Sequence, residues 1–166
     1  MEEAHKGTFA DMALYKIERA KDELDTAKIV LEAQKYKAAN NRAYYACFHA
    51  ITAVLALEPI AFKKHKDTLA YFNKNYVRTE IFPREMGRKI SKLEIIRHKS
   101  DYDDFYIASK EEAAEQVTTA ETLIDTIERY VAEKILLSEL EKGETSADDA
   151  GWLSPEESEE EISDES

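Results

Sequence analysis

The chain has 166 residues, 43% of them hydrophobic, with only four glycines and three prolines, which indicates one folded domain of long helices and excludes a disordered chain. Cys47 is the single cysteine and no apolar stretch reaches the about 18 residues of a membrane span, which excludes a disulfide framework, a cysteine-rich metal site and a transmembrane protein. The net charge of −12 comes almost entirely from residues 139–166, which hold twelve acidic residues and Lys142 as the only base.

The uneven charge divides the chain into two parts. Residues 1–138 keep a net charge of only −1. We therefore predict a helical bundle over residues 1–140 and an acidic, disordered tail over residues 141–166. The first twelve residues contain no apolar segment of the kind found in signal peptides, so we expect a cytoplasmic protein.

The first two predicted helices follow from the spacing of apolar residues. Residues 11–34 form the first, with an inward face of Leu14, Ile17, Leu24 and Leu31. Residues 38–57 form the second, with an inward face of Tyr44, Phe48, Ile51 and Leu55. Tyr45 and Ala56 widen the apolar arc of this second helix, which indicates a central position in the bundle. Pro59 ends it, because the residue before a proline avoids helical backbone angles.

A basic zone covers residues 63–99, which contain eleven lysines and arginines and only four acidic residues. It begins with Lys63, Lys64, His65 and Lys66. Such a zone is able to bind phosphates. The alternative is a solvated surface balanced by acidic residues of the first and last helices, and the sequence leaves both open.

Two shorter helices are predicted inside the basic zone. One covers residues 66–75, with Leu69 and Phe72 facing inward, and residues 76–82 are predicted to be a connection. The other starts with Pro83 at the first helical position, which proline favours, and runs to about Lys99. Its inward face comprises Met86, Ile90, Leu93 and Ile96 or Arg97.

The last helix has the clearest pattern in the sequence. Ser109 and Glu112 match a capping box, in which each side chain bonds the backbone N–H of the other residue. A seam with alternating spacings of four and three residues then passes through Ala113, Val117, Ala120, Ile124, Ile127, Val131 and Ile135. Such a heptad seam packs along another helix. Together the patterns predict an all-α, up-and-down bundle of four to five helices with a long C-terminal helix.

Two pairs of polar residues are candidates for a functional site. Arg42 and His49 share one helix face but lie about 10 Å apart, and a histidine in so aromatic a helix is more often a hydrogen-bonded core residue. Arg97 and Asp101 are four residues apart and are able to pair across one turn. An arginine in line with the apolar face of its helix indicates the edge of a cleft. The alternative is a salt bridge that only fixes the end of the helix.

Three segments together resemble the HEPN family, the higher-eukaryote and prokaryote nucleotide-binding domains, and above all its small stand-alone prokaryotic branch. They are RAYYACFHAITAVL at 42–55, HKDTLAYF at 65–72 and RHKSDYD at 97–103. The resemblance covers about residues 10–136. It implies a bundle of four or five helices, usually dimeric, with a cleft near the arginine-containing helix. Many relatives are encoded beside a small nucleotidyltransferase as a toxin and antitoxin.

The resemblance also implies which residues line the cleft. Ribonuclease members of the family carry an arginine in the late helix, then four to six residues, then a histidine, followed by a tyrosine. Arg97 occupies the arginine position here, but Asp101 and Tyr102 stand where the histidine is expected and His98 adjoins Arg97 at the wrong spacing. The candidate cleft residues for a nucleotide or RNA are Arg97, Asp101, Tyr102, Arg42, Tyr45, His49, Lys64 and His65.

The sequence leads to two functional hypotheses. The first, favoured by the missing histidine, is a non-catalytic module that binds a nucleotide, RNA or a nucleotidyltransferase partner in a toxin–antitoxin-like pair. The second is a metal-independent endoribonuclease toxin in which Arg97 stabilises phosphate charge and His98 or His49 replaces the usual base. The sequence contains no phosphate-cradling glycine loop and no zinc-binding helix, so we expect no cofactor or metal. We also expect a homodimer, because relatives are usually dimeric and the aromatic face at Tyr44, Tyr45 and Phe48 exceeds what one side of a small bundle needs.

Overall fold

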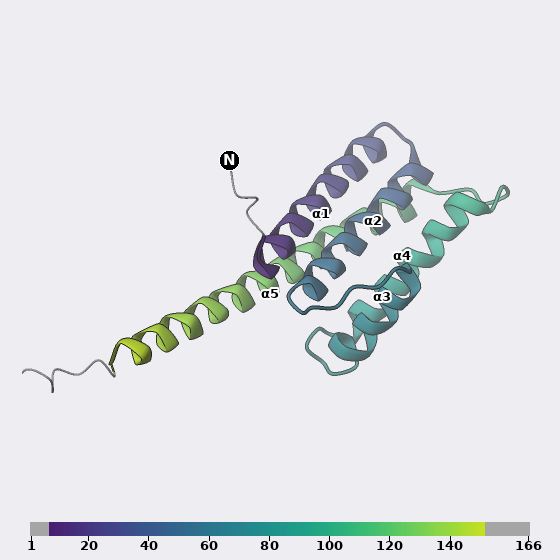
Figure 1. Ribbon diagram of the computed structural model, residues 1–166. Helices are drawn as coiled ribbons and strands as arrows, with labels where there is room; N and C mark the ends of the chain where they lie inside the picture. Colours follow the sequence, from purple (N-terminus) through teal and green to yellow (C-terminus); the bar gives the residue numbers. More distant parts are fainter. Residues whose placement is uncertain (1–6, 152–166) are drawn as a thin grey trace, which may run out of the picture. The chain divides into compact units, whose positions relative to one another are not determined.

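The computed structural model describes the backbone of residues 7–151 and the side chains of residues 7–143. The chain forms α1 (Phe9–Glu32), α2 (Tyr36–Ala56), α3 (His65–Phe72), the π-helix η1 (Asn73–Val77), α4 (Arg84–Tyr102) and α5 (Lys110–Gly151), as Figure 1 shows. The described residues contain no strand, which confirms the all-α prediction. By its internal contacts the chain divides into two units, with the boundary in the sequence between Val131 and Ala132. The helical bundle belongs to the first unit.

Helix α1 packs through alanines more than through leucines. Thr8 and Asp11 form a capping box at its start, which satisfies two backbone N–H groups. Its buried residues are Ala13, Ile17, Ala20, Leu24 and Ala27. The prediction that Leu14 faces inward is wrong, because the helix presents the neighbouring Ala13 to the core and leaves Leu14 48% exposed.

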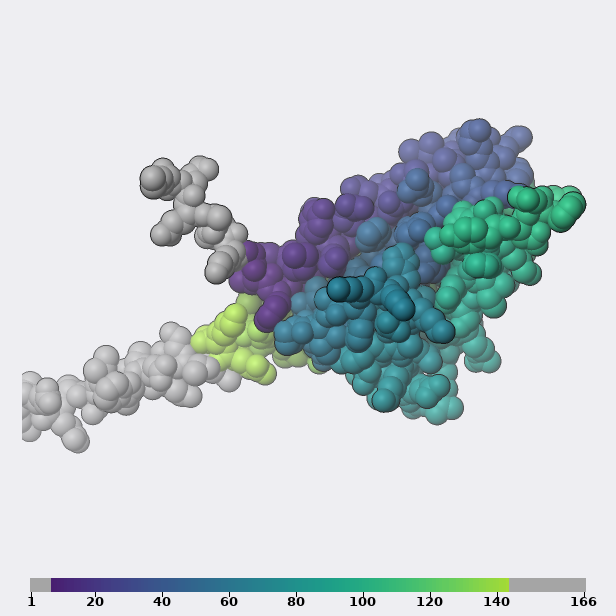
Figure 2. Space-filling model, turned by 45° about the vertical axis from the view of Figure 1, so that its right-hand side comes forward, coloured from purple at the N-terminus to yellow at the C-terminus, as the bar shows by residue number. Residues whose placement is uncertain are grey.

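Helix α2 is the central helix, as the sequence predicted. Its fully buried side chains include five alanines together with Ile51 and Val54, and they lie around most of its circumference. Phe48, expected to be fully buried, is only half-buried. Figure 2 shows purple and blue residues of α1 and α2 on the surface beside teal residues of α3 and α4.

Helix η1 replaces the first part of the predicted connection at residues 76–82. The backbone N–H of Arg78 donates to the carbonyl of Asn73 at 2.8 Å, a π-type turn that follows α3 without a break. The wider turn directs both Tyr76 and Val77 into the core. An aromatic cluster surrounds them, formed by Phe72, Tyr76, Phe82 and Tyr130.

Helix α4 buries Met86, Ile90, Leu93 and Ile96 as predicted. It differs from the prediction at both ends. Pro83 is the residue that caps the helix rather than its first helical residue, and the helix continues past Lys99 to Tyr102. That extra turn matters for the site, because it carries Asp101 onto the same helix as Arg97.

Helix α5 confirms the predicted seam from Ala113 to Val131, all of whose members are buried. One of the two hydrogen bonds of the predicted capping box is present: Glu112 N–H donates to Ser109 Oγ at 3.1 Å. The Glu112 carboxylate accepts a hydrogen bond from the Tyr106 hydroxyl instead. Lys28 of α1 pairs with Glu121 at 2.8 Å, and Lys21 pairs with Glu128, so the two helices are antiparallel.

The C-terminal boundary of helical structure lies later than predicted. Helix α5 continues to Gly151, past the expected start of a disordered tail at residue 141. Extending an existing helix is less costly than starting one, because each added residue needs only its own backbone to be ordered. The remaining part of the predicted tail, residues 152–166, lies outside the described residues. Within the part that is described, no helix is long and apolar enough to cross a membrane.

Candidate ligand-binding cleft

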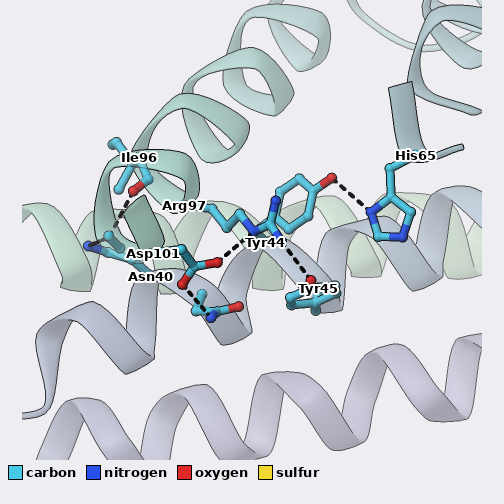
Figure 3. A network of polar contacts seen from close by, with 9 residues as sticks. Asn40, Tyr44, Tyr45, His65, Ile96, Arg97 and Asp101 are labelled. Carbon is cyan, nitrogen blue, oxygen red and sulfur yellow. Dashed lines mark hydrogen bonds and ion pairs between the residues drawn. The ribbon is translucent and has the colours of Figure 1, made fainter. Parts of the chain in front are cut away.

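Arg97 of α4 is the centre of a polar network between α4 and α2 (Figure 3). Only 19% of its side chain is exposed. Its Nη2 donates to the hydroxyl of Tyr45 at 2.8 Å. Its Nε lies 3.0 Å from Oδ2 of Asp101, which makes an ion pair rather than a well-aligned hydrogen bond. The predicted pairing across one helical turn is therefore confirmed.

Three tyrosine rings surround the guanidinium of Arg97. Its central carbon lies 5.2 Å from the ring centre of Tyr44, 5.3 Å from that of Tyr45 and 5.9 Å from that of Tyr102. The negative face of an aromatic ring attracts a cation, most strongly where water is partly excluded. Burial lowers the pKa of Arg97, but Tyr45, Asp101 and Tyr44 raise it by more, so the net shift is upward. The arginine is a fixed cation.

Asp101 is held from its other side by α2. Asn41 Nδ2 donates to Oδ1 of Asp101 at 2.8 Å, so the carboxylate bridges Asn41 and Arg97. One residue earlier on each helix, the buried Asn40 donates to Ser100 Oγ at 3.2 Å, and Ser100 in turn donates to the carbonyl of Ile96. These contacts fix the last turn of α4 against α2 and thereby orient the guanidinium.

His65, the first residue of α3, lies on the other side of Tyr44 from Arg97 and contacts the Tyr44 hydroxyl. Its ring stacks on Phe48 with centres 3.9 Å apart, and its Nδ1 lies 3.5 Å from the Tyr44 hydroxyl. Burial, and then the positive charge of Arg97, lower the pKa of His65 below its usual value. The imidazole is therefore neutral at pH 7, where it is able to accept a proton.

A cavity of about 450 Å³ opens beside this network. Its lining comprises Tyr44, His65, Lys66, Glu94, Ile95, Arg97, His98 and Lys99. The lining is mostly basic, with Glu94 as its one carboxylate. A cavity of this kind fits an anionic ligand with a planar group, because a fixed guanidinium and aromatic edges lie together at its wall.

Five of the eight predicted site residues are brought together. Tyr45, Asp101 and Tyr102 contact Arg97, and His65 shares the cavity with it. Arg42, His49 and Lys64 do not line this cavity.

The three residues outside the cavity have other surroundings. Arg42 pairs with Glu23 of α1 at 3.1 Å. His49 is half-buried, and its pKa is lowered by burial and then by the charge of Arg19 in α1, so it belongs to the α1 side of α2. Lys64 caps α3 and is exposed. The prediction that these three line one cleft with Arg97 does not hold for this cavity, because Arg42 and His49 face α1 instead.

Sequence reasoning missed Asn41, Lys66 and Glu94. Asn41 stands beside Asn40 in a helix otherwise rich in alanine and aromatic residues, and two amides there were a signal that the helix packs against polar groups. Glu94 is one turn before Arg97 on α4, so its place at the same cavity follows from the helical period. Among residues 7–143, no group of three or more His, Cys, Asp or Glu side chains is arranged to hold a metal ion.

Comparison with known proteins agrees with this geometry. The HEPN domain family matches residues 13–130, which contain all of the cleft residues. A UPF0332 protein of Thermotoga maritima is 32% identical over 113 residues, covering 68% of this chain and 86% of that protein. A protein of Methanocaldococcus jannaschii named "Putative toxin MJ0605" is 34% identical over 117 residues, covering 70% of this chain and 87% of that protein. The chain belongs to the HEPN domain family.

Proposed function

We propose that this chain is the HEPN component of a toxin–antitoxin-like pair and that it binds a nucleotide, RNA or a nucleotidyltransferase partner through the Arg97 cleft without cleaving RNA. The observation that carries the proposal is the fixed Arg97 guanidinium, held by Asp101 and three tyrosines at the wall of a basic cavity. The toxin names of two relatives from Methanocaldococcus jannaschii support the wider assignment.

The same network argues against catalysis. Metal-independent cleavage of RNA needs a base at the 2′-hydroxyl, an acid for the leaving oxygen and a cation on the phosphate. Arg97 supplies the cation. Asp101, in the segment where the resemblance expects a histidine, is ion-paired with Arg97 and accepts a hydrogen bond from Asn41, so it acts as an acceptor in this network. Its charge also repels a phosphate.

One observation favours a second function, a metal-independent endoribonuclease. His65 lies in the same cavity as Arg97, and its lowered pKa makes it a neutral base. Of the two histidines expected to serve as a base, His49 lies outside the cavity. His98 lines the cavity, and its ring lies against that of Tyr102 in a tilted arrangement with ring centres 4.8 Å apart. An acid for the leaving oxygen is still missing from this arrangement.

We expect the purified protein to bind RNA but not to cleave it. The measurement is a titration of fluorescent RNA, followed by gel analysis after incubation with a chelator. Arg97→Ala is expected to abolish binding, because it removes the cation that Tyr45 and Asp101 hold in place at the cavity wall. Arg42→Ala is the matched control: it removes an equal charge from an arginine that pairs with Glu23, and it is expected to bind like the wild type. Cleavage by the wild type that disappears in both Arg97→Ala and His65→Ala would establish the ribonuclease instead.

We further propose that the protein is a homodimer. The reason given by the sequence needs correction, because Tyr44 is buried and Tyr45 and Phe48 pack on Arg97 and His65 instead of forming a free apolar face. Among the described residues, the two most exposed large apolar side chains lie after the end of α4, where Phe105 is 94% and Ile107 is 89% exposed. Large exposed apolar side chains close in sequence mark interaction surfaces.

Light scattering at micromolar concentration is therefore expected to give about twice the 19.0 kDa mass of one chain. Replacing both Phe105 and Ile107 by serine is expected to shift the mass toward the monomer. A wild-type mass of one chain would contradict the proposal.

We also propose a cytoplasmic location, which the single Cys47 supports because cytosolic proteins rarely rely on disulfides.

A further inference from the structure

A second cavity lies between η1 and α4, with a volume of about 740 Å³. Four basic side chains line it: Arg78, Arg84, Arg88 and Lys92. We call it the arginine groove. The groove belongs to the basic zone of residues 63–99, but none of the eight candidate cleft residues lines it, and it shares only Ile95 with the Arg97 cavity.

The floor of the arginine groove depends on Gly87. A Cβ atom at this position would lie 3.0 Å from Asn73 Oδ1 and 3.1 Å from Val77 Cγ1, closer than ordinary side-chain contacts. The absence of a side chain therefore lets η1 lie close against α4. The π-turn of η1 ends at Arg78 and places this arginine on the side of the groove opposite α4.

The charge of the arginine groove is only partly neutralised within the chain. Arg84 pairs with Glu80 at 3.1 Å and Lys92 pairs with Glu115 at 2.9 Å, both largely exposed to solvent. Arg78 and Arg88 have no ion pair among the described side chains. Exposed pairs contribute little and exchange readily for another anion. A polyanion is the ligand that this groove fits.

The arginine groove and the Arg97 cavity lie along one face of α4. Arg84, Arg88 and Lys92 on the groove are followed at helical spacing by Ile95, which lines both, and by Lys99 on the Arg97 cavity. From Arg84 to Lys99 the helix rises about 22 Å. A mononucleotide in the Arg97 cavity would leave most of this basic face uncovered.

We propose that the two cavities bind one continuous RNA strand, with a nucleotide in the Arg97 cavity and the following phosphates along the arginine groove. This inference rests on the proposed function and specifies its ligand as a polynucleotide. Arginine forks match phosphate oxygens with two parallel hydrogen bonds, and three of the four basic residues in the groove are arginines. Each phosphate bound along the groove releases counterions, which makes RNA binding depend on salt.

The test compares a fluorescent 20-nucleotide RNA with a fluorescent mononucleotide on the full chain. The double variant Arg78→Gln/Arg88→Gln is expected to lose at least tenfold in RNA affinity and to keep its mononucleotide affinity. The slope of log affinity against log salt is expected to fall by about 1.4, from two lost phosphate contacts to a single strand. The control is Arg129→Gln, an exposed arginine of α5 that lies outside both cavities and is expected to leave both affinities unchanged.

The outcomes separate the two proposals. RNA binding that needs Arg97 but is unchanged in the double variant would overturn the continuous strand and leave the proposed function standing. An equal loss in the Arg129→Gln control would also overturn it, since the effect would then be one of net charge. If polyglutamate of matched length competes as well as RNA, the groove is a site for an acidic protein, and the inference fails. If the wild type binds neither RNA nor the mononucleotide, the inference fails and only partner binding is left of the proposed function.

Discussion

Replacing Ile127 by alanine is expected to lower the free energy of unfolding by about 2–5 kcal/mol, the largest effect we expect from a single substitution on stability. Ile127 is fully buried in the seam of α5, with Ile124 and Val131 beside it in the same seam. Truncation removes apolar contacts and leaves a cavity, because helices packed on several sides are not free to collapse into the space. Urea unfolding followed by circular dichroism measures the change.

The matched control for Ile127 lies on the same helix. Leu136 of α5 is 57% exposed, so Leu136→Ala loses little burial and is expected to change stability by less than about 0.5 kcal/mol. Equal effects of the two substitutions would contradict the position of the seam. A small effect of both would mean that α5 contributes less to the bundle than its burial indicates.

Replacing Arg97 by lysine is expected to reduce RNA affinity at least about tenfold although the charge is kept. The guanidinium contacts Tyr45 and Asp101 at once through different nitrogens and lies among three rings. A lysine ammonium is a point charge that cannot repeat this geometry. The measurement is the same RNA titration, with Arg42→Lys as the control at an arginine that is 48% exposed and pairs with Glu23 of α1. Wild-type affinity in Arg97→Lys would show that charge alone matters.

The free energy of unfolding of Arg97→Ala shows whether a loss of RNA binding comes from the missing guanidinium or from a destabilised fold. The Arg97–Asp101 pair is mostly buried, with 19% and 24% of the two side chains exposed. Arg97→Ala is therefore expected to cost about 1–3 kcal/mol, between the values for exposed and for fully buried pairs. Asn41 still holds Asp101 in the variant, which limits the loss. A larger loss would attribute the binding defect to unfolding.

The prediction of buried residues was most accurate where the apolar pattern lies within one long helix. The seam from Ala113 to Val131 repeats over five turns, and a pattern of that length has few alternative explanations. In α1 the prediction was right for Ile17 and Leu24 and wrong for Leu14, because Leu14 is more hydrophobic than Ala13 while the core needs the smaller residue. The π-turn of η1 could not be predicted, since it results from the fit of Val77 against Gly87 in another helix.

Only part of the site could be predicted, because only contacts within one helix follow from residue spacing. The Arg97–Asp101 pair is local and follows from a spacing of four residues. The contact between Arg97 and Tyr45 joins residues of α4 and α2, and no spacing within either helix indicates it. Arg42 and Arg97 were both candidate ligand-binding residues in the sequence. Only the packing of α2 between α1 and α4 assigns one to Glu23 and the other to the cleft.

The alanines of the first two helices affect how the bundle folds. Eight alanines of α1 and α2 are fully buried. Alanine has no side-chain rotamers to lose, so burying these residues costs backbone entropy only. The two helices are joined by the short turn between Glu32 and Tyr36, which keeps their contacts close in sequence. Such local contacts form fast, and the α1–α2 hairpin is therefore a natural first structure on which α4 and α5 assemble.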